Sequence, residues 1–175
     1  MSYLHSTVRL DGFTGLAQPV AMRAPEVYQG CGCGHPADIW SLAVTLFDWI
    51  KPGVFGTAGI IEGIQEESWC IAKLMLLFPG WTGQPANDAY LERLIRIGKL
   101  LINSPVQDNP DEKIVLVLSL EEEMQTMGIP SELENLFRFL FVPNPKQRPS
   151  ATKALASDQF QALKEAALAG KLVGT

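Results

Sequence analysis

The sequence predicts a mainly α-helical domain built around one buried central helix. Three observations lead to this fold class. Residues 39–50 are apolar on nearly every side of a helix, residues 90–102 carry apolar side chains at helical spacing, and Pro and Gly residues separate these segments. No internal repeat or low-complexity tract interrupts the pattern, so we expect a single packed helical domain.

The first elements are predicted from their start and stop signals. Residues 26–29 form one helical turn, which the glycine-rich run 30–34 ends. Asp38 begins the central helix as its N-cap, because a short side-chain oxygen can accept from the free N–H groups of a first turn. The central helix extends to about Ile50, and Lys51-Pro52-Gly53 is its stop signal.

The later elements follow the same logic with one ambiguous segment. Residues 114–118 have strand composition but run into a helix start at Ser119, so their state stays open. Ser131 and Glu134 have the spacing of a capping box. The remaining expectations are helices over 66–78, 90–102, 131–141 and 150–168, with a polar linker over 104–112.

Composition excludes several classes of function. The chain has 175 residues, 47% of them apolar and 19% charged, which is ordinary for a globular domain. Its net charge of −5 and the lack of a basic run argue against nucleic-acid binding, and the longest apolar stretch is too short for a membrane span. Three cysteines form no disulfide framework, so we expect an intracellular protein, cytoplasmic or nuclear.

One short motif has the spacing of metal ligands. Cys31-x-Cys33-x-His35 offers three donors suited to zinc, but a fourth ligand is not close in the sequence, since Cys70 and His5 are remote. A flexible glycine-rich loop is the alternative that we favour.

Three motifs occur in an informative order along the chain. They are Arg23-Ala24-Pro25-Glu26, then Asp38-Ile39-Trp40-Ser41, and far downstream Gln147-Arg148-Pro149-Ser150. Together they resemble the C-terminal lobe of protein kinases, and the preceding Gln18-Pro19-Val20-Ala21-Met22 is closest to SR-protein kinases and their relatives. The resemblance covers roughly residues 20–160, and the long stretch 76–131 is similar to an insert of that kinase group.

The resemblance carries expectations for individual residues. Glu26 is expected to form a buried bidentate ion pair with Arg148, because a planar guanidinium satisfies both carboxylate oxygens where water is excluded. Ala24, Pro25 and Trp40 belong to the same structural motifs, and residues 18–23 are expected to position a substrate. Asp38, without the catalytic loop that it contacts in the family, is expected to cap its helix, meet water, or carry a raised pKa from burial.

The motifs of phosphoryl transfer are absent from the sequence. It contains no Gly-x-Gly-x-x-Gly, no Val-Ala-x-Lys, no His-Arg-Asp and no Asp-Phe-Gly. Residues 3–6 look like the tetrapeptide before the family's catalytic loop. Only residues 7–17 stand between them and Gln18, too few to hold a catalytic loop, a metal-binding Asp segment and an activation loop. Asp11-Gly12-Phe13 has the residue types of Asp-Phe-Gly in another order. We expect this segment to form a turn, and a metal site is the alternative.

We therefore expect a truncated, catalytically inactive kinase-like (pseudokinase) fragment that acts at most as a protein-interaction module. No cofactor is expected for this chain. ATP and Mg²⁺ would be bound only if the missing ATP-binding half of a kinase domain were supplied. The alternatives are the C-terminal part of an active Ser/Thr protein kinase, transferring phosphate from ATP to protein, and an unrelated helical adaptor.

The expected organisation is an irregular leader over 1–20, a kinase-like lobe over 21–165 and a tail over 166–175. Apolar surface is expected beside Asp38 and the Ala21-Met22 segment, which would favour a protein partner or self-association.

Overall fold

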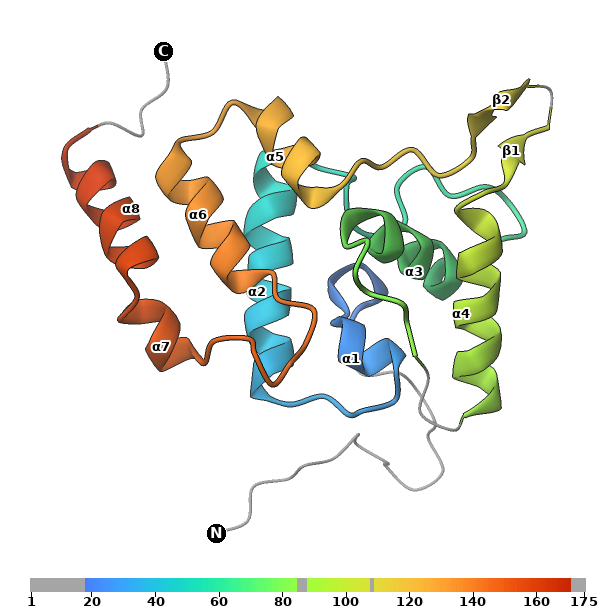
Figure 1. The fold of residues 1–175 in the computed structure, drawn as a ribbon, viewed down its shortest axis with the longest axis horizontal. Coiled ribbons are helices and arrows are strands. Elements are labelled where there is room, and N and C mark those ends of the chain that lie inside the picture. The colour runs from blue at the N-terminus through green and yellow to red at the C-terminus, as the bar shows by residue number, and fades with distance from the viewer. Residues whose placement is uncertain (1–17, 85–87, 108, 171–175) are drawn as a thin grey trace, which may run out of the picture.

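The computed structural model describes residues 18–84, 88–107 and 109–170. This part of the chain is mainly helical, with one small antiparallel hairpin (Figure 1). None of the helices within these ranges is long and apolar enough to cross a membrane. In chain order the elements are the 3-10 helix η1 (Val20–Met22), α1 (Pro25–Tyr28), α2 (His35–Ile50), α3 (Glu66–Leu77), α4 (Ala89–Leu101), β1 (Pro105–Val106), β2 (Asn109–Lys113), α5 (Leu120–Met127), α6 (Ser131–Leu140), α7 (Ala151–Leu155) and α8 (Asp158–Leu168).

Helix α2 lies at the centre of the domain, with α6 and α8 to one side and α1, α3 and α4 to the other (Figure 1). Its inner face packs against a cluster of aromatic rings whose centroids lie 5.1 to 6.5 Å apart. Edge-on and stacked ring pairs of this kind add to the free energy gained by burial alone. The cluster consists of Trp40, Phe47, Phe55, Phe78, Phe137 and Phe141.

Helices α3 and α4 approach each other closely at Gly98. A Cβ atom at this position would lie 2.7 Å from Cγ2 of Ile71 and 3.1 Å from the carbonyl oxygen of Ser68. Glycine therefore stands inside α4 at a cost in helix propensity, because no side chain fits between the two helices. Beside this contact, Trp69, Leu101 and Val115 are part of a second small core.

The helix positions agree broadly with the sequence prediction, whereas two capping residues were predicted wrongly. Asp38 is not the N-cap of α2, because the helix already begins at His35 after Gly34, with Pro36 in its first turn. Ser131 is not a capping residue either, since Pro130 occupies the N-cap position of α6 and the Ser131 hydroxyl contacts Glu132 instead. The complete capping box belongs to Ser119 and Glu122 of α5.

Two further segments differ from the prediction. The expected linker contains β1 and β2, in which Pro105 pairs with Lys113 and Val106 with Asn109. The expected last helix is divided into α7 and α8, because the Ser157 hydroxyl accepts from the backbone N–H of Phe160 and so begins a new helix. The ambiguous segment 114–118 is neither strand nor helix.

Candidate functional site

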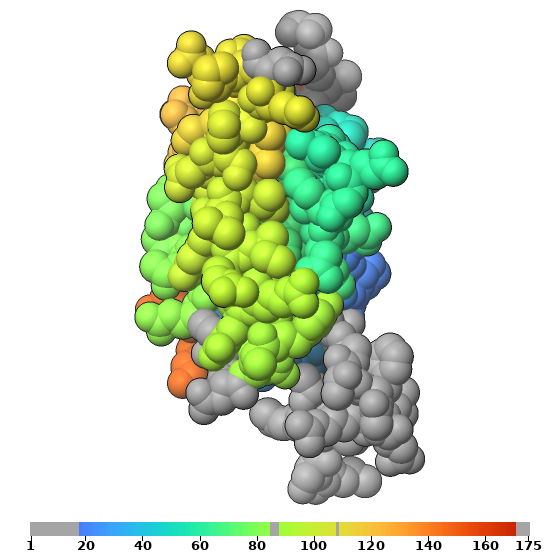
Figure 2. Space-filling view, turned by 90° about the vertical axis from the view of Figure 1, so that its right-hand side faces the viewer, coloured from blue at the N-terminus to red at the C-terminus, as the bar shows by residue number. Residues whose placement is uncertain are grey.

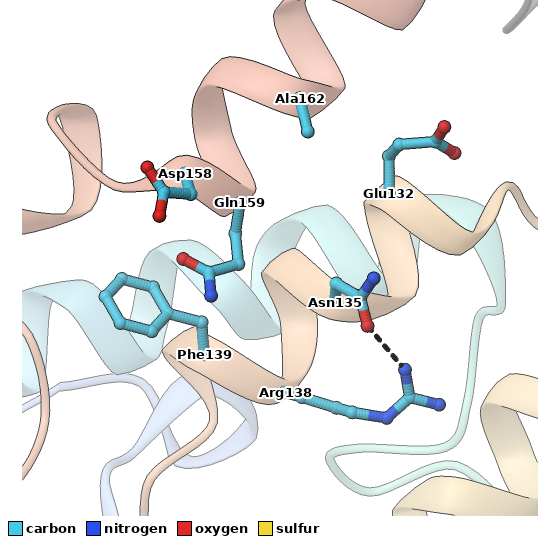
Figure 3. A pocket seen from close by; sticks show the side chains of 7 residues that line it. All are labelled: Glu132, Asn135, Arg138, Phe139, Asp158, Gln159 and Ala162. Carbon is cyan, nitrogen blue, oxygen red and sulfur yellow. Dashed lines mark hydrogen bonds between the residues drawn. The ribbon is translucent and has the colours of Figure 1, made fainter.

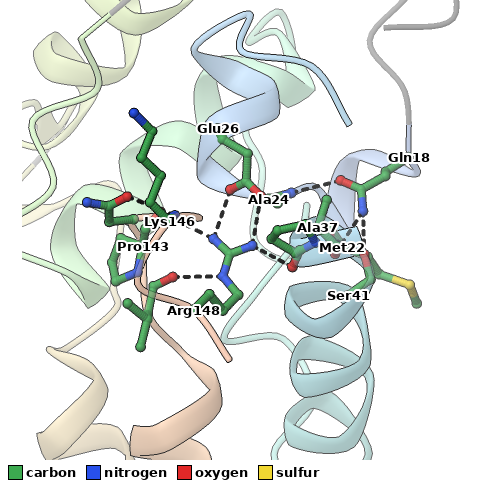
Figure 4. A network of polar contacts seen from close by, with 12 residues as sticks. Gln18, Met22, Ala24, Glu26, Ala37, Ser41, Pro143, Lys146 and Arg148 are labelled. Atoms are coloured by element: carbon green, nitrogen blue, oxygen red, sulfur yellow. Dashed lines mark hydrogen bonds and ion pairs between the residues drawn. The ribbon is translucent and has the colours of Figure 1, made fainter. Parts of the chain in front are cut away.

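A buried ion pair connects the first and the last of the three sequence motifs (Figure 4). The Arg148 Nη1 atom lies 2.7 Å from Glu26 Oε1, and Nη2 lies 2.8 Å from Glu26 Oε2. The Arg148 side chain is fully buried and that of Glu26 is 5% exposed. The expected bidentate pair is therefore present, between residues that are 122 positions apart in the sequence.

All five N–H groups of the Arg148 guanidinium have acceptors. Besides the two bonds to Glu26, Arg148 donates to the carbonyl oxygens of Pro36 at 2.7 Å, Val142 at 2.8 Å and Pro143 at 3.2 Å. The guanidinium also lies 5.0 Å from the ring centroid of Trp40. A fully satisfied guanidinium of this kind fixes α1, the start of α2 and the loop after α6 relative to one another.

Gln18 holds the segment before α1 against α2. Its Nε2 atom donates to the carbonyl oxygen of Ala37 at 3.0 Å and lies 2.7 Å from Ser41 Oγ, while its Oε1 atom accepts from the backbone N–H of Ala24 at 3.1 Å. Ser41 in turn donates to the carbonyl oxygen of Met22 at 3.0 Å. Gln18 has a φ of 71°, a strained value for a residue with a side chain, and these bonds hold it there.

Arg23 extends the same network toward α3. Its Nη2 atom donates to the carbonyl oxygen of Gln18 at 3.0 Å, and Nη1 lies 3.9 Å from Glu67 Oε1. Its guanidinium also lies 5.2 Å from the ring centroid of Tyr28. Residues 18–23 therefore form an ordered loop, in which Pro19 and Ala21 are exposed and Val20 and Met22 are half-buried.

The other motif residues divide between core and surface. Ala24, Pro25 and Trp40 are buried around the ion pair. The Asp38 side chain is instead 74% exposed, and its Oδ2 atom lies 3.9 Å from His35 Nδ1. Of the three outcomes expected for Asp38, contact with water is the one that this exposure supports.

The candidate metal ligands do not come together. Cys31 is exposed, Cys33 is half-buried, and the His35 side chain is 99% exposed. Within residues 18–84, 88–107 and 109–170, no three His, Cys, Asp or Glu side chains are grouped so that they could hold a metal ion. His5, residues 3–6 and Asp11-Gly12-Phe13 lie outside the described residues.

A groove between α6 and α8 brings two carboxylates to opposite walls (Figure 3). Its volume is about 480 Å³, Glu132 comes from α6 and Asp158 from α8, and Phe139 lines it between them. Arg138 also borders the groove, but its charge is paired with Glu121 and Glu134 on α5 and α6. The other residues that line the groove, Asn135, Gln159 and Ala162, include no nucleophile, so its geometry indicates no particular chemistry.

The sequence did not predict two sets of contacts. The first is the set of hydrogen bonds by which the Gln18 side chain connects to α2, and the second is the set of backbone carbonyl groups that accept from Arg148. The Gln18 side chain bridges to Ala37 and Ser41, which follow 19 and 23 positions later, and no local pattern identifies such bonds. The acceptors at Pro36, Val142 and Pro143 are backbone atoms, which are present at every position. The prolines themselves were a partial signal, because they fix the direction of the chain beside the guanidinium.

Comparison with known proteins gives one distant similarity. The chain is 26% identical over 143 residues to the dual specificity protein kinase lkh1 of Schizosaccharomyces pombe, and the alignment covers 76% of this chain. The chain spans 19% of the length of that relative. No protein-family model matches the chain, and no solved structure matches it. The similarity supports a weak kinase-like relationship, and the mainly helical fold is compatible with it.

We predict that Arg148→Ala lowers the free energy of unfolding by about 3–5 kcal/mol, because it leaves the Glu26 carboxylate buried without a partner. Arg148→Lys will restore little, since one ammonium cannot replace five directed N–H groups. Urea denaturation followed by circular dichroism measures both. Arg138→Ala, which breaks an exposed ion pair on α6, is the control and will cost under about 1 kcal/mol. A loss equally small for Arg148→Ala would contradict the role given to the buried pair.

We also predict that the three thiols differ in reactivity. Burial of Cys70 in α3 raises the pKa of its thiol to about 11, whereas Cys31 is exposed. At pH 8, Ellman's reagent will modify Cys31 quickly, Cys33 more slowly because partial burial raises the pKa of its thiol, and Cys70 only after unfolding in urea. Because the folded-state pKa of Cys70 is raised, its neutral form stabilises the fold fully below pH 9, and this contribution is lost as the pH rises toward 11. Rapid modification of all three thiols in the folded protein would contradict the prediction.

Proposed function

We propose that this chain is a kinase-like protein-interaction domain that performs no phosphoryl transfer with the residues it carries. The observation that carries the proposal is an exposed apolar face on α2, the helix that otherwise forms the centre of the core. Leu42 is 51% exposed, Trp49 83% and Ile50 43%. Leu42, the half-buried Leu46 and Trp49 follow each other at helical spacing, so they share one face of the helix.

This face is unusual because of its size and its place. A single exposed leucine is ordinary in globular proteins, but a tryptophan in line with two leucines on a central helix is typical of an interaction surface. An aromatic side chain buries about 150–250 Å² on contact, and tryptophan is enriched among residues that dominate binding energy. The exposed side chains continue along α2 from Asp38, beside which apolar surface was expected.

The sequence supports the inactive part of the proposal. Phosphoryl transfer requires a phosphate-binding loop, a lysine on the phosphates, Mg²⁺ ligands and a base at the nucleophile. None of the corresponding motifs occurs in the sequence. The assignment to the SR-protein-kinase-like group depends on residues 18–26 and Arg148, and we propose that such a domain acts inside the cell, in the cytoplasm or nucleus, on a protein partner or a second copy.

The second candidate function is the C-terminal part of an active Ser/Thr protein kinase whose ATP-binding residues lie outside this sequence. The ordered loop over residues 18–23 favours this candidate, because its exposed Pro19 and Ala21 are held in place by Gln18 and Ser41 and could position a substrate. In that case ATP and Mg²⁺ would be held by the missing part.

We expect the purified chain to transfer no phosphate. Incubation with radiolabelled ATP, Mg²⁺ and a Ser/Arg-rich peptide will give the same incorporation as a sample without protein, because the sequence lacks the groups that bind phosphates and Mg²⁺. A known SR-protein kinase is the positive control. Incorporation that persists through repurification and scales with the amount of this chain would contradict the inactive assignment.

We expect the chain to self-associate or to co-purify with a protein through the α2 face, and Trp49→Glu to abolish this association. Light scattering coupled to gel filtration measures the mass of each species. Leu168→Glu is the matched control, since Leu168 is 80% exposed on α8, away from the α2 face. A folded parent protein that stays monomeric and free of partner at high concentration would refute the interaction role.

A further inference from the structure

The sequence Cys31-Gly32-Cys33 places two free thiols one residue apart, in the loop that joins α1 to α2. This loop crosses the lower end of the domain in the view of Figure 1. Within the described residues, no further side chain joins the two thiols to form a metal site, and the proposed interaction role uses neither of them. The pair is therefore a chemical feature that the proposed function leaves unexplained.

Chain geometry keeps the two cysteines within reach of a disulfide bond. The Cα atoms of residues i and i+2 lie at most about 7 Å apart, and a disulfide joins Cα atoms about 4.4–6.8 Å apart. Only a fully straight chain would therefore hold the two thiols too far from each other. Here the chain bends at Cys31, and Gly32 has a φ of 90°, which a residue with a side chain rarely adopts. The loop thus turns between the two cysteines.

Both ends of this loop are held in place by the fold. The backbone N–H of Cys31 donates to the carbonyl oxygen of Glu26 at 2.9 Å, which fixes the first cysteine to the end of α1. Gly34 directly follows the second cysteine and is the N-cap of α2. Arg148 binds both Glu26 and the carbonyl oxygen of Pro36, and so holds α1 beside the start of α2. The folded chain therefore keeps the two cysteines near each other before any bond forms.

The environments of the thiols suit a reaction in two steps. Cys31 is exposed, so a dissolved reagent reaches its sulfur first. Cys33 is half-buried and packs against the main core, where burial and the carboxylates of Asp38 and Glu26 raise the pKa of its thiol. Cys70, the third thiol, is buried on α3, behind the face that α4 forms in Figure 2. A reagent in solution therefore meets Cys31 before the other two thiols.

We propose that Cys31 and Cys33 form a reversible redox pair, which closes to an intrachain disulfide when the domain meets a small-molecule disulfide such as oxidised glutathione. The Cys31 thiolate attacks one sulfur of the reagent, which leaves a mixed disulfide on Cys31 and releases one glutathione. The Cys33 thiolate then attacks the Cys31 sulfur, and the bond from Cys31 to the second glutathione breaks. Each departing glutathione thiolate takes up the proton that the attacking thiol has lost. Two protein thiols are thus oxidised, and one disulfide is reduced to two thiols.

The disulfide formed in this way is easily reduced. A bond across one intervening residue is strained, and strained or exposed disulfides are the labile and regulatory ones. This property agrees with a chain that works inside the cell, where disulfides are usually transient and redox-sensing. The closed ring lies directly before α2, the helix that carries the exposed apolar face, but the redox pair does not depend on that face as a binding surface.

The test exposes the folded, reduced chain to oxidised glutathione, blocks the remaining thiols with N-ethylmaleimide in urea, and cleaves the chain before its aspartates for mass spectrometry. Fragment 11–37 then carries Cys31 and Cys33, and the fragment that begins at Asp48 carries Cys70. We expect fragment 11–37 to be lighter by two hydrogen atoms and free of both reagents, and Cys70 to carry maleimide. Dilution of the protein will not change the rate, and excess reduced glutathione will reopen the bond. Glutathione or maleimide retained on fragment 11–37, or a disulfide between two copies, would overturn the proposal.

Single variants test the order of the two steps. Cys33→Ser lacks the second thiol, so we expect it to accumulate the mixed disulfide on Cys31, which the parent forms only transiently. Cys31→Ser keeps the less accessible thiol, and we expect it to react with oxidised glutathione at least about tenfold more slowly than Cys33→Ser. Cys70→Ala is the matched control and will close at the rate of the parent. Equal rates for Cys31→Ser and Cys33→Ser, or a parent that stops at the mixed disulfide, would overturn the proposal.

Discussion

The bidentate pair between Glu26 and Arg148 is the interaction on which the rest of the structure depends. A buried charge pair contributes little to stability when it is compared with apolar residues of the same volume, because both ions lose their hydration. Its effect is on specificity. The guanidinium has acceptors on α1, in the first turn of α2 and in the loop after α6. Because Glu26 and Pro36 lie 122 and 112 positions from Arg148, it holds two distant parts of the sequence in one arrangement.

Two surfaces take their order from this pair. On one side, α1 is fixed, and Gln18 connects the loop before α1 to α2. Gln18 has a positive φ, which glycine would adopt without strain, and the hydrogen bonds of its side chain hold it in this conformation. On the other side, the carbonyl oxygens of Val142 and Pro143 are fixed, and with them the loop after α6. Strain and buried charge are both costly, and proteins usually keep such costs where geometry matters for function.

The sequence predicted the helices well because apolar spacing and Pro or Gly punctuation act over many residues. It failed where two local signals compete for one position. Asp38 has the chemistry of an N-cap, but Pro36 suits the first turn and the helix begins earlier at His35. The Glu26–Arg148 pair could be predicted because both residues stand in recognisable motifs. The Gln18 bonds could not, since they depend on tertiary contacts that leave no periodic trace.

The exposed face of α2 follows from the way in which the core packs. An aromatic cluster that packs α2 on one side is sufficient to hold the helix, so its other side can carry Leu42 and Trp49 in water without loss of the fold. The free energy of burying Leu42 and Trp49 is therefore not gained by the folded chain itself, and it remains available to a protein that binds there.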